Sequence, residues 1–217
     1  MKFNKYKTFR WERIKGAEFE GYYDMPKLQP VHNLDPFGLV PFHLCKSVPD
    51  PEKHWFDFYE DDYQFERFWN KPSTYLPILK RFAGGISPDF SIYIDMPRSQ
   101  QIWNCWRNRV MAYHLQQNGI TVIPNVGWSD EKSLGWAFDG LPSNSILAIT
   151  TQGCMGKDYY CKQSLLNGIH ELVLQKHPEK LVVYGIFPDA WLERFPMPIV
   201  VFDTFSQEKW GKKNGKR

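Results

Sequence analysis

Carboxylate side chains follow several short apolar runs in this 217-residue chain. In one shared crevice, such groups either hold a divalent cation through oxygen ligands or raise one another's pKa to give a general acid or base. Each also has a structural alternative, because Asp is common in turns and at helix starts. The candidates are Asp61 and Asp62 after residues 55–59, Asp95 after residues 90–94, and Asp203 after residues 199–202.

Other polar and aromatic residues occupy equivalent positions. Arg109 lies near the edge of the apolar face of a predicted helix and can reach inward to a carboxylate or phosphate, whereas Arg107 and Asn108 are expected outside. Trp128 follows a glycine at a strand end, where it can stack on a planar ring or serve as a core residue. The further strand-end residues are Arg98, Asn125, Thr151, Gln152 and Tyr184.

Alternating strands and helices are expected to position these groups. Apolar spacing of three and four residues predicts helices, and short apolar runs predict strands. Residues 63–69, 75–82, 100–118 and 159–177 are the predicted helices, and Gly84-Gly85 is expected to end the second of them. The predicted strands are residues 39–44, 55–59, 90–94, 121–124, 145–150, 181–184 and 199–202.

The predicted strands are almost wholly apolar, as in parallel sheets covered on both faces. We therefore predict an α/β fold with a mostly parallel sheet, forming a small or incomplete (β/α) barrel. The alternative is an open three-layer α/β sheet. In both architectures the carboxyl ends of the strands converge on one open crevice, so function is expected there.

Charge divides the chain into three parts. The net charge of +3 combines +5 in residues 1–15, +5 in residues 209–217 and −7 between them. We expect a basic N-terminal arm over residues 1–36, a single domain over residues 37–208 and a basic, flexible tail over residues 209–217. Such ends either contact nucleic acid or act as solubilising tails. The acidic body disfavours a wide nucleic-acid groove and allows a compact pocket or a metal site.

Several classes of protein are disfavoured. No apolar run approaches the roughly 20 residues of a membrane span, and the N-terminus does not read as a secretory signal, so we expect a cytoplasmic protein without a membrane partner. The four cysteines are expected to be free thiols. The sequence has no P-loop, GxGxxG, HExxH or GxSxG motif, which disfavours nucleotide-hydrolysing motors, Rossmann dehydrogenases and α/β-hydrolases.

Two central stretches resemble an uncharacterised family, domain-of-unknown-function family 4417, found in phages, plasmids and their bacterial hosts. The stretches are Ser87-Pro88-Asp89-Phe90-Ser91-Ile92-Tyr93-Ile94-Asp95-Met96-Pro97 and Ile123-Pro124-Asn125-Val126-Gly127-Trp128, with Gln101-Ile102, Asn104, Arg107-Asn108-Arg109 and Gly119-Ile120 between them. The likeness covers roughly residues 37–203. It implies a mobile-element setting without a defined activity, and it adds Asp89 and Arg107 to the candidate residues.

Two hypotheses follow. In the first, the protein is an enzyme acting on a nucleotide, nucleobase or nucleic acid, with Asp95 as acid, base or nucleophile, Arg109 as anion clamp and Trp128 as stacking surface. Asp61 and Asp62 are further catalytic candidates, and Arg98, Asn125, Asp89 and Tyr184 are candidate substrate contacts. In the second, it is a binding protein without catalysis that docks on a host or phage protein, or on nucleic acid. A cofactor is not defined by the sequence, although a divalent cation would suit the carboxylates.

Overall fold

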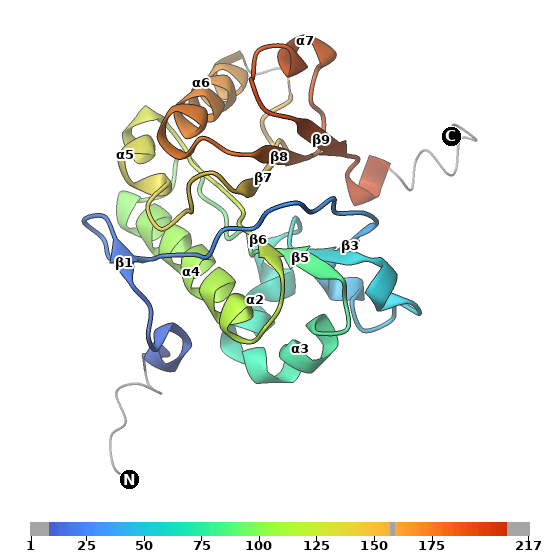
Figure 1. The fold of residues 1–217 in the computed structure, drawn as a ribbon. Coiled ribbons are helices and arrows are strands. Elements are labelled where there is room, and N and C mark those ends of the chain that lie inside the picture. The colour runs from blue at the N-terminus through green and yellow to red at the C-terminus, as the bar shows by residue number, and fades with distance from the viewer. Residues whose placement is uncertain (1–8, 157–158, 208–217) are drawn as a thin grey trace.

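The computed structural model describes residues 9–156 and 159–207, and nearly all of its strands are parallel (Figure 1). The strands are β1 (Phe19–Glu20), β2 (Met25–Pro26), β3 (Leu39–Pro41), β4 (Trp55–Asp57), β5 (Gly84–Ile86), β6 (Val122–Ile123), β7 (Ile146–Thr150), β8 (Lys180–Tyr184) and β9 (Ile199–Phe202). The α-helices are α2 (Asp62–Asn70), α3 (Pro72–Leu79), α4 (Arg98–Gln117), α5 (Leu134–Ala137), α6 (Tyr159–Lys176) and α7 (Asp189–Leu192). Short 3-10 turns are η1 (Trp11–Ile14), η2 (Phe42–Leu44), η3 (Pro51–Lys53) and η4 (Glu131–Ser133).

Seven parallel strands follow one another in chain order. One sheet has the order β3-β4-β5-β6 and the other β7-β8-β9. A parallel bridge between Asn125 and Ala148 joins them, with Val126 N–H donating to Ala148 O at 2.8 Å and Ala148 N–H to Pro124 O at 2.9 Å. Within the described residues β9 does not pair with β3, so no closed barrel forms. The α/β prediction is confirmed, and the sheets are open, as in the alternative architecture.

A buried apolar cluster shows how far the sheets curl. It takes at least one residue from each of the seven parallel strands, together with Val31, Leu34 and Tyr59. Because neighbours along a strand point to opposite faces, Ala148 and Val182 join this interior cluster, whereas Leu147 and Leu181 point outward. The strand residues in the interior cluster are Leu39, Trp55, Ile86, Ile123, Ile146, Ala148, Val182, Tyr184 and Phe202.

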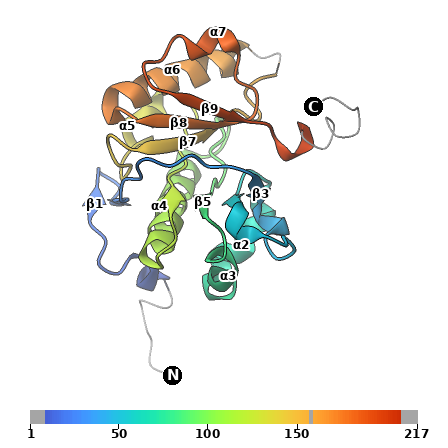
Figure 2. The same ribbon diagram turned by 45° about the vertical axis from the view of Figure 1, so that its right-hand side comes forward.

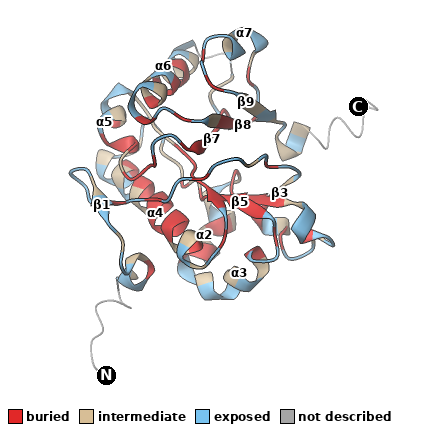
Figure 3. Cartoon of the chain, in the orientation of Figure 1, coloured by how far each residue is buried: buried red, intermediate tan, exposed pale blue. Residues whose placement is uncertain are grey.

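The helices cover the outer face of both sheets (Figure 2). Phe56 and Val122 of the first sheet point into a cluster with residues of α2, α3 and α4. Leu147 and Leu181 of the second sheet pack with residues of α4, α5 and α6. Red strands and the buried sides of these helices mark these layers in Figure 3. The apolar runs in the sequence therefore belong to strands that are buried on both faces.

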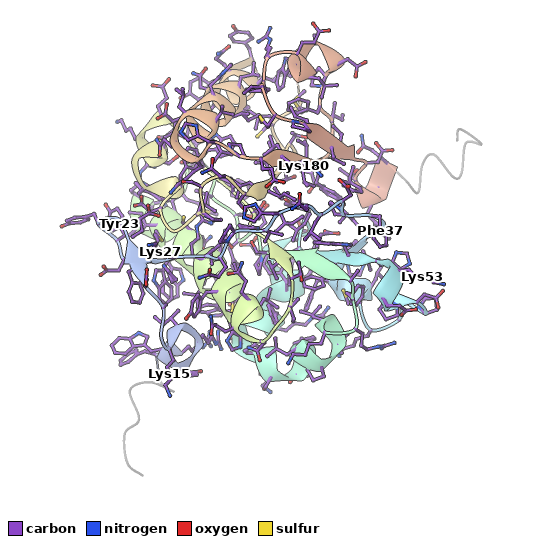
Figure 4. All side chains as sticks on the ribbon, in the orientation of Figure 1. Lys15, Tyr23, Lys27, Phe37, Lys53 and Lys180 are labelled. Atoms are coloured by element: carbon purple, nitrogen blue, oxygen red, sulfur yellow. The ribbon has the colours of Figure 1, made fainter. Side chains whose placement is uncertain are left out.

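The chain before β3 closes the amino-terminal end of the interior cluster. Ile146 N–H donates to Val31 O at 2.9 Å, and Lys180 Nζ donates to Leu34 O at 3.0 Å. Tyr23 and Lys27 project from the antiparallel hairpin of β1 and β2, far from Lys180 (Figure 4).

Residues 1–8 and 209–217 of the predicted basic ends lie outside the described residues. The division into arm, domain and tail stays a prediction.

One predicted strand is wrong. Residues 90–94 are not a strand, and β5 lies at Gly84–Ile86, where a helix end was expected. The Phe90 backbone is held by a side chain of α4 instead: Phe90 N–H donates to Asn108 Oδ1 at 2.7 Å, and Asn108 Nδ2 donates to Phe90 O at 3.2 Å. The other predicted helices and strands are confirmed to within a few residues at their ends.

Two aromatic side chains explain why a Gly-Gly pair forms a central strand. Gly84 and Gly85 lie opposite Trp55 and Phe56 in the ladder, and these rings cover them. A Cβ atom at Gly85 would lie 2.1 Å from the Phe56 ring, closer than any real contact. The glycines therefore provide the space that the rings of β4 fill.

Gly85→Ala is expected to destabilise the protein by about 2 kcal/mol or more, because the new methyl group overpacks the Phe56 site. Gly135→Ala is the matched control, since a Cβ there meets nothing within 4 Å and Ala favours a helix over Gly by up to about 1 kcal/mol. Urea unfolding of both variants measures the difference. Equal stabilities would contradict this packing of β5.

Candidate functional site

Loops after the parallel strands meet around a crevice of about 210 Å³. It lies at the carboxyl ends of β3, β4, β7, β8 and β9, the edge at which the sequence predicted function. The carboxyl ends are left open because the segment before β3 occupies the opposite end. The crevice is lined by Pro41, His43, Tyr59, Glu60, Asp61, Gln64, Gln152, Tyr184, Phe205 and Ser206.

Two buried tyrosines form one wall of this crevice. The rings of Tyr59 and Tyr184 stack with centroids 4.7 Å apart and planes 19° from parallel. The Tyr184 hydroxyl accepts the Phe205 N–H at 2.8 Å, which ties the end of β8 to the chain after β9. The stack thus joins the two sheets across the interior, from the end of β4 to the end of β8.

A network of polar side chains lies behind this wall, and we call it the Asn125 network: Tyr59, Ser87, Asp89 and Asn125. Tyr59 OH donates to Asn125 Oδ1 at 2.8 Å, and Asn125 Nδ2 donates to Asp89 Oδ1 at 2.7 Å. The Asn125 N–H donates to Ser87 Oγ at 2.8 Å. Three strand ends, those of β4, β5 and β6, therefore contribute to one hydrogen-bonded chain.

Asp89 is the carboxyl group of this network, and its pKa is strongly raised. The residue is partly buried. Burial raises the pKa of Asp89 to about 7, the Asn125 hydrogen bond opposes that rise, and the nearby Asp62 carboxylate adds to it. Burial, together with Asp89, raises the pKa of Tyr59 well above its ordinary value. A carboxyl group that titrates near neutral pH can take up or release a proton during a reaction.

The predicted carboxylates are only partly brought together. Asp61 is exposed and lines the crevice, while Asp62 accepts the Ser91 hydroxyl at 2.8 Å and the Ser91 N–H at 3.2 Å. Burial raises the pKa of Asp62. Asp203 is exposed after β9. Asp95 lies on an exposed turn before α4, away from any strand end, because the predicted strand before it does not form.

The arginines serve the fold. Arg98 pairs with Asp130, with Nη2 2.9 Å from Oδ2, and this hydrogen bond lowers the pKa of Asp130. Arg107 lies over the Phe90 ring at 3.7 Å and pairs with Glu66 at 2.9 Å. The side chains of Arg107 and Asn108 are largely covered, not outside as expected.

Arg109 is 2% exposed and reaches inward. Its guanidinium donates to three backbone carbonyls: Ala137 O at 2.6 Å, Asp139 O at 3.0 Å and Asn125 O at 3.2 Å. These contacts occupy the guanidinium with backbone oxygens, and the role of anion clamp stays a prediction. The side chain braces the loop after β6 and the end of α5.

Trp128 is also a packing residue in this structure. Its indole N–H donates to Ser164 O at 3.2 Å, and its ring meets Phe138 edge to face. The ring lies against Gly168 of α6, where a Cβ atom would come within 2.1 Å of it. Of the two roles that the sequence left open for Trp128, the observed contacts are those of the core residue.

Sequence reasoning missed Tyr59 and the pair formed by Glu60 and His43. Glu60 Oε2 bonds to His43 Nδ1, and its side chain is 9% exposed. Asp61 is a candidate because it is a polar residue just after a predicted strand. The same criterion selects Tyr59 and Glu60 once the strand is ended at Asp57. Pairing with His43, from the end of β3, has no local signal, because it depends on two strands being neighbours.

Within the described residues, no three His, Cys, Asp or Glu side chains come together as ligands for a metal ion. The divalent cation considered from the sequence thus has no ligand set there. In the same part of the chain, no helix is long and apolar enough to cross a membrane. All four cysteines are free thiols, as the sequence predicted.

Fold and site together define an open, parallel α/β protein with a polar crevice at its carboxyl edge. The chain belongs to the family described as Domain of unknown function (DUF4417), whose model matches residues 17–203. It is 32% identical over 168 residues to the Gene 1 protein of Mycobacterium phage D29, an alignment that covers 75% of this chain and 60% of that protein.

The Gene 1 protein of Mycobacterium phage L5 is 31% identical over 171 residues, which cover 77% of this chain and 73% of the relative. The chain thus spans about 60% of the length of one phage relative and about three quarters of the other. No solved structure matches the chain significantly. The family and the phage setting expected from the sequence are confirmed.

Asp89→Asn is expected to flatten the dependence of stability on pH. Because the pKa of Asp89 is raised to about 7, the folded protein holds a proton that the unfolded chain loses near pH 4. This contribution is fully present below about pH 4 and is lost as the pH rises to about 7. Between pH 5 and 7 the wild type should lose about 2 kcal/mol relative to Asp89→Asn.

Urea unfolding at pH 5, 6, 7 and 8 measures this difference. Asp95→Asn is the control, because it removes an exposed carboxylate and should run parallel to the wild type. If Asp89→Asn also ran parallel, Asp89 would have an ordinary pKa.

Arg109→Gln is expected to cost about 3 kcal/mol or more, since buried carbonyls lose their donors. Arg98→Gln removes a pair that is partly exposed to solvent and should cost about 1 kcal/mol or less. Thermal and urea unfolding compare the two. Arg109→Gln as stable as Arg98→Gln would show that the carbonyls find other donors.

Proposed function

We propose that this protein is an enzyme that acts on a nucleotide or nucleobase at the carboxyl edge of its strands, with Asp89 as general acid or base. The observation that carries the proposal is the Asn125 network. It joins Asp89, a carboxyl group with a pKa of about 7, through Asn125 to Tyr59 in the aromatic wall of the crevice. A general acid or base works best when its pKa lies near the working pH.

The lining of the crevice supports a planar, polar ligand. The Tyr59 and Tyr184 rings offer apolar surface, and Gln64, Gln152 and Asp61 offer edge groups that can donate or accept hydrogen bonds. A volume of about 210 Å³ is below the roughly 300–1,000 Å³ of sites for drug-sized ligands. That size suits one base or part of a nucleoside better than a nucleic-acid strand.

The placement of the site also supports catalysis over a purely structural role. Catalytic groups in parallel α/β folds gather where loops converge after the strands. Asp89 follows β5 and Asn125 follows β6, and both are polar groups in a largely buried setting, which a fold retains at a cost in stability.

The test is a panel of nucleosides, nucleoside monophosphates and a short single-stranded oligonucleotide, with binding followed by calorimetry and product formation by chromatography. Asp89→Asn should lower turnover at least about 100-fold, the range for loss of a general acid or base. Asp95→Asn, the same change on an exposed turn, should leave turnover within about twofold. The proposal fails if no member of the panel binds, or if both variants lose activity equally.

A second function, docking on a host or phage protein without catalysis, is favoured by exposed aromatic residues near the hairpin of β1 and β2. Tyr22 is 91% exposed, Phe19 46% and Tyr23 39%. Large exposed aromatic side chains in a group are typical of interaction surfaces. The same panel separates the two functions, since a docking protein would leave every nucleobase compound unbound and unchanged.

A further inference from the structure

Tyr59 belongs to both parts of the site. Its ring forms the crevice wall with Tyr184, and its hydroxyl donates to Asn125 Oδ1 at 2.8 Å. Asp89 does not line the crevice but lies at the far end of the same hydrogen-bonded chain. Tyr59 is therefore the side chain through which the crevice wall and the carboxyl group are joined.

The Asn125 amide can face Asp89 with either of two chemically different sides. With Nδ2 toward Asp89, an N–H stabilises the ionised carboxylate; with Oδ1 toward it, two acceptors repel. In the observed orientation the Tyr59 hydroxyl donates to Oδ1 while Nδ2 donates to Asp89. In the flipped amide that hydroxyl would have to accept from Nδ2 and Oδ1 would face the carboxylate, so the two contacts together favour the observed orientation. Ser87 and Arg109 hold the backbone N–H and C=O of Asn125. The backbone of Asn125 is therefore fixed, and only the orientation of its side-chain amide is left to be set.

We propose that Tyr59 is a positioning residue: its hydroxyl fixes the Asn125 amide with the N–H side toward Asp89 and thereby sets how readily that carboxyl group ionises. The Tyr59 hydroxyl and the Asn125 amide thereby gain a role that the proposed function does not give them. It rests on contacts between protein groups alone, so it can be tested without a ligand.

Three titratable groups near Asp89 must be considered with it. Asp62 of α2 raises the pKa of Asp89, because two carboxylates close together resist ionising together. Tyr59 stays neutral over the range in which Asp89 titrates, since its own pKa is raised well above the ordinary value. Cys154, after β7, also has a raised pKa through burial and remains a thiol there. Asp62 is thus the charged neighbour to control.

The experiment is carbon-13 NMR of the aspartate carboxyl groups in the full-length protein, titrated from pH 4 to 9. The wild-type Asp89 signal, identified by its loss in Asp89→Asn, should titrate near pH 7. Tyr59→Phe keeps the ring and removes only the hydroxyl, and it should raise the pKa of Asp89 by about one unit, the effect of a weakened hydrogen bond to a charged group. Asn125→Ala should raise it at least as far.

Tyr184→Phe is the matched control, because it removes the hydroxyl of the stacked partner, which bonds the Phe205 N–H instead. Its Asp89 pKa should stay within about 0.2 units of the wild type. Asp62→Asn should lower the Asp89 pKa, which checks that the signal responds to charge. The inference is overturned if Tyr59→Phe leaves the Asp89 pKa unchanged, or if Tyr184→Phe shifts it equally.

A shifted Asp89 pKa in Tyr59→Phe supports the positioning role even if no nucleobase compound binds, in which case only the proposed function fails. Conversely, members of the panel could bind and be turned over while the Asp89 pKa in Tyr59→Phe equals that of the wild type. The proposed function would then stand, and the positioning role of Tyr59 would be rejected. Thermal melts of each variant confirm that the titrated protein is folded.

Discussion

The fold depends on one junction between the two sheets, which we call the seam. There Asn125, just after β6, forms a parallel bridge with Ala148 of β7. In the described residues a single parallel bridge joins the sheets there, and the buried Arg109 guanidinium holds the Asn125 carbonyl together with those of Ala137 and Asp139. A buried cation is costly unless its donors are used. Arg109 meets this condition with backbone oxygens, so its guanidinium holds two chain segments together, the loop after β6 and the chain at the end of α5.

The same seam fixes where chemistry can occur. Because the Asn125 backbone is held on both sides, its side chain is free to link Tyr59 with Asp89. The segment around Val31 covers the amino-terminal end of the interior, which leaves the carboxyl ends open to solvent. Polar groups gather at the one edge where the strands stop pairing and buried backbone needs side-chain partners.

Membership in a phage-associated family of unknown function makes the site more informative than the fold. Open parallel α/β folds host many unrelated chemistries, so the architecture alone does not select a reaction. The stretches that resemble the family prove to have mixed roles. Four of their side chains hold loops and helices in place: Arg107, Asn108, Arg109 and Trp128. Two others, Asp89 and Asn125, belong to the network beside the crevice.

Local patterns in the sequence predict the class of fold, most helices and strands, and the edge at which polar groups collect, because apolar periodicity and strand-end polarity are local properties. Long-range contacts set which carboxyl group joins the Asn125 network. Asp95 looked like a strand end, but Asn108 holds the Phe90 backbone and the strand forms at Gly84–Ile86, which places Asp89 beside Asn125. The pKa of Asp89 and the stack of Tyr59 on Tyr184 depend on neighbours far apart in the chain, and no local pattern encodes them.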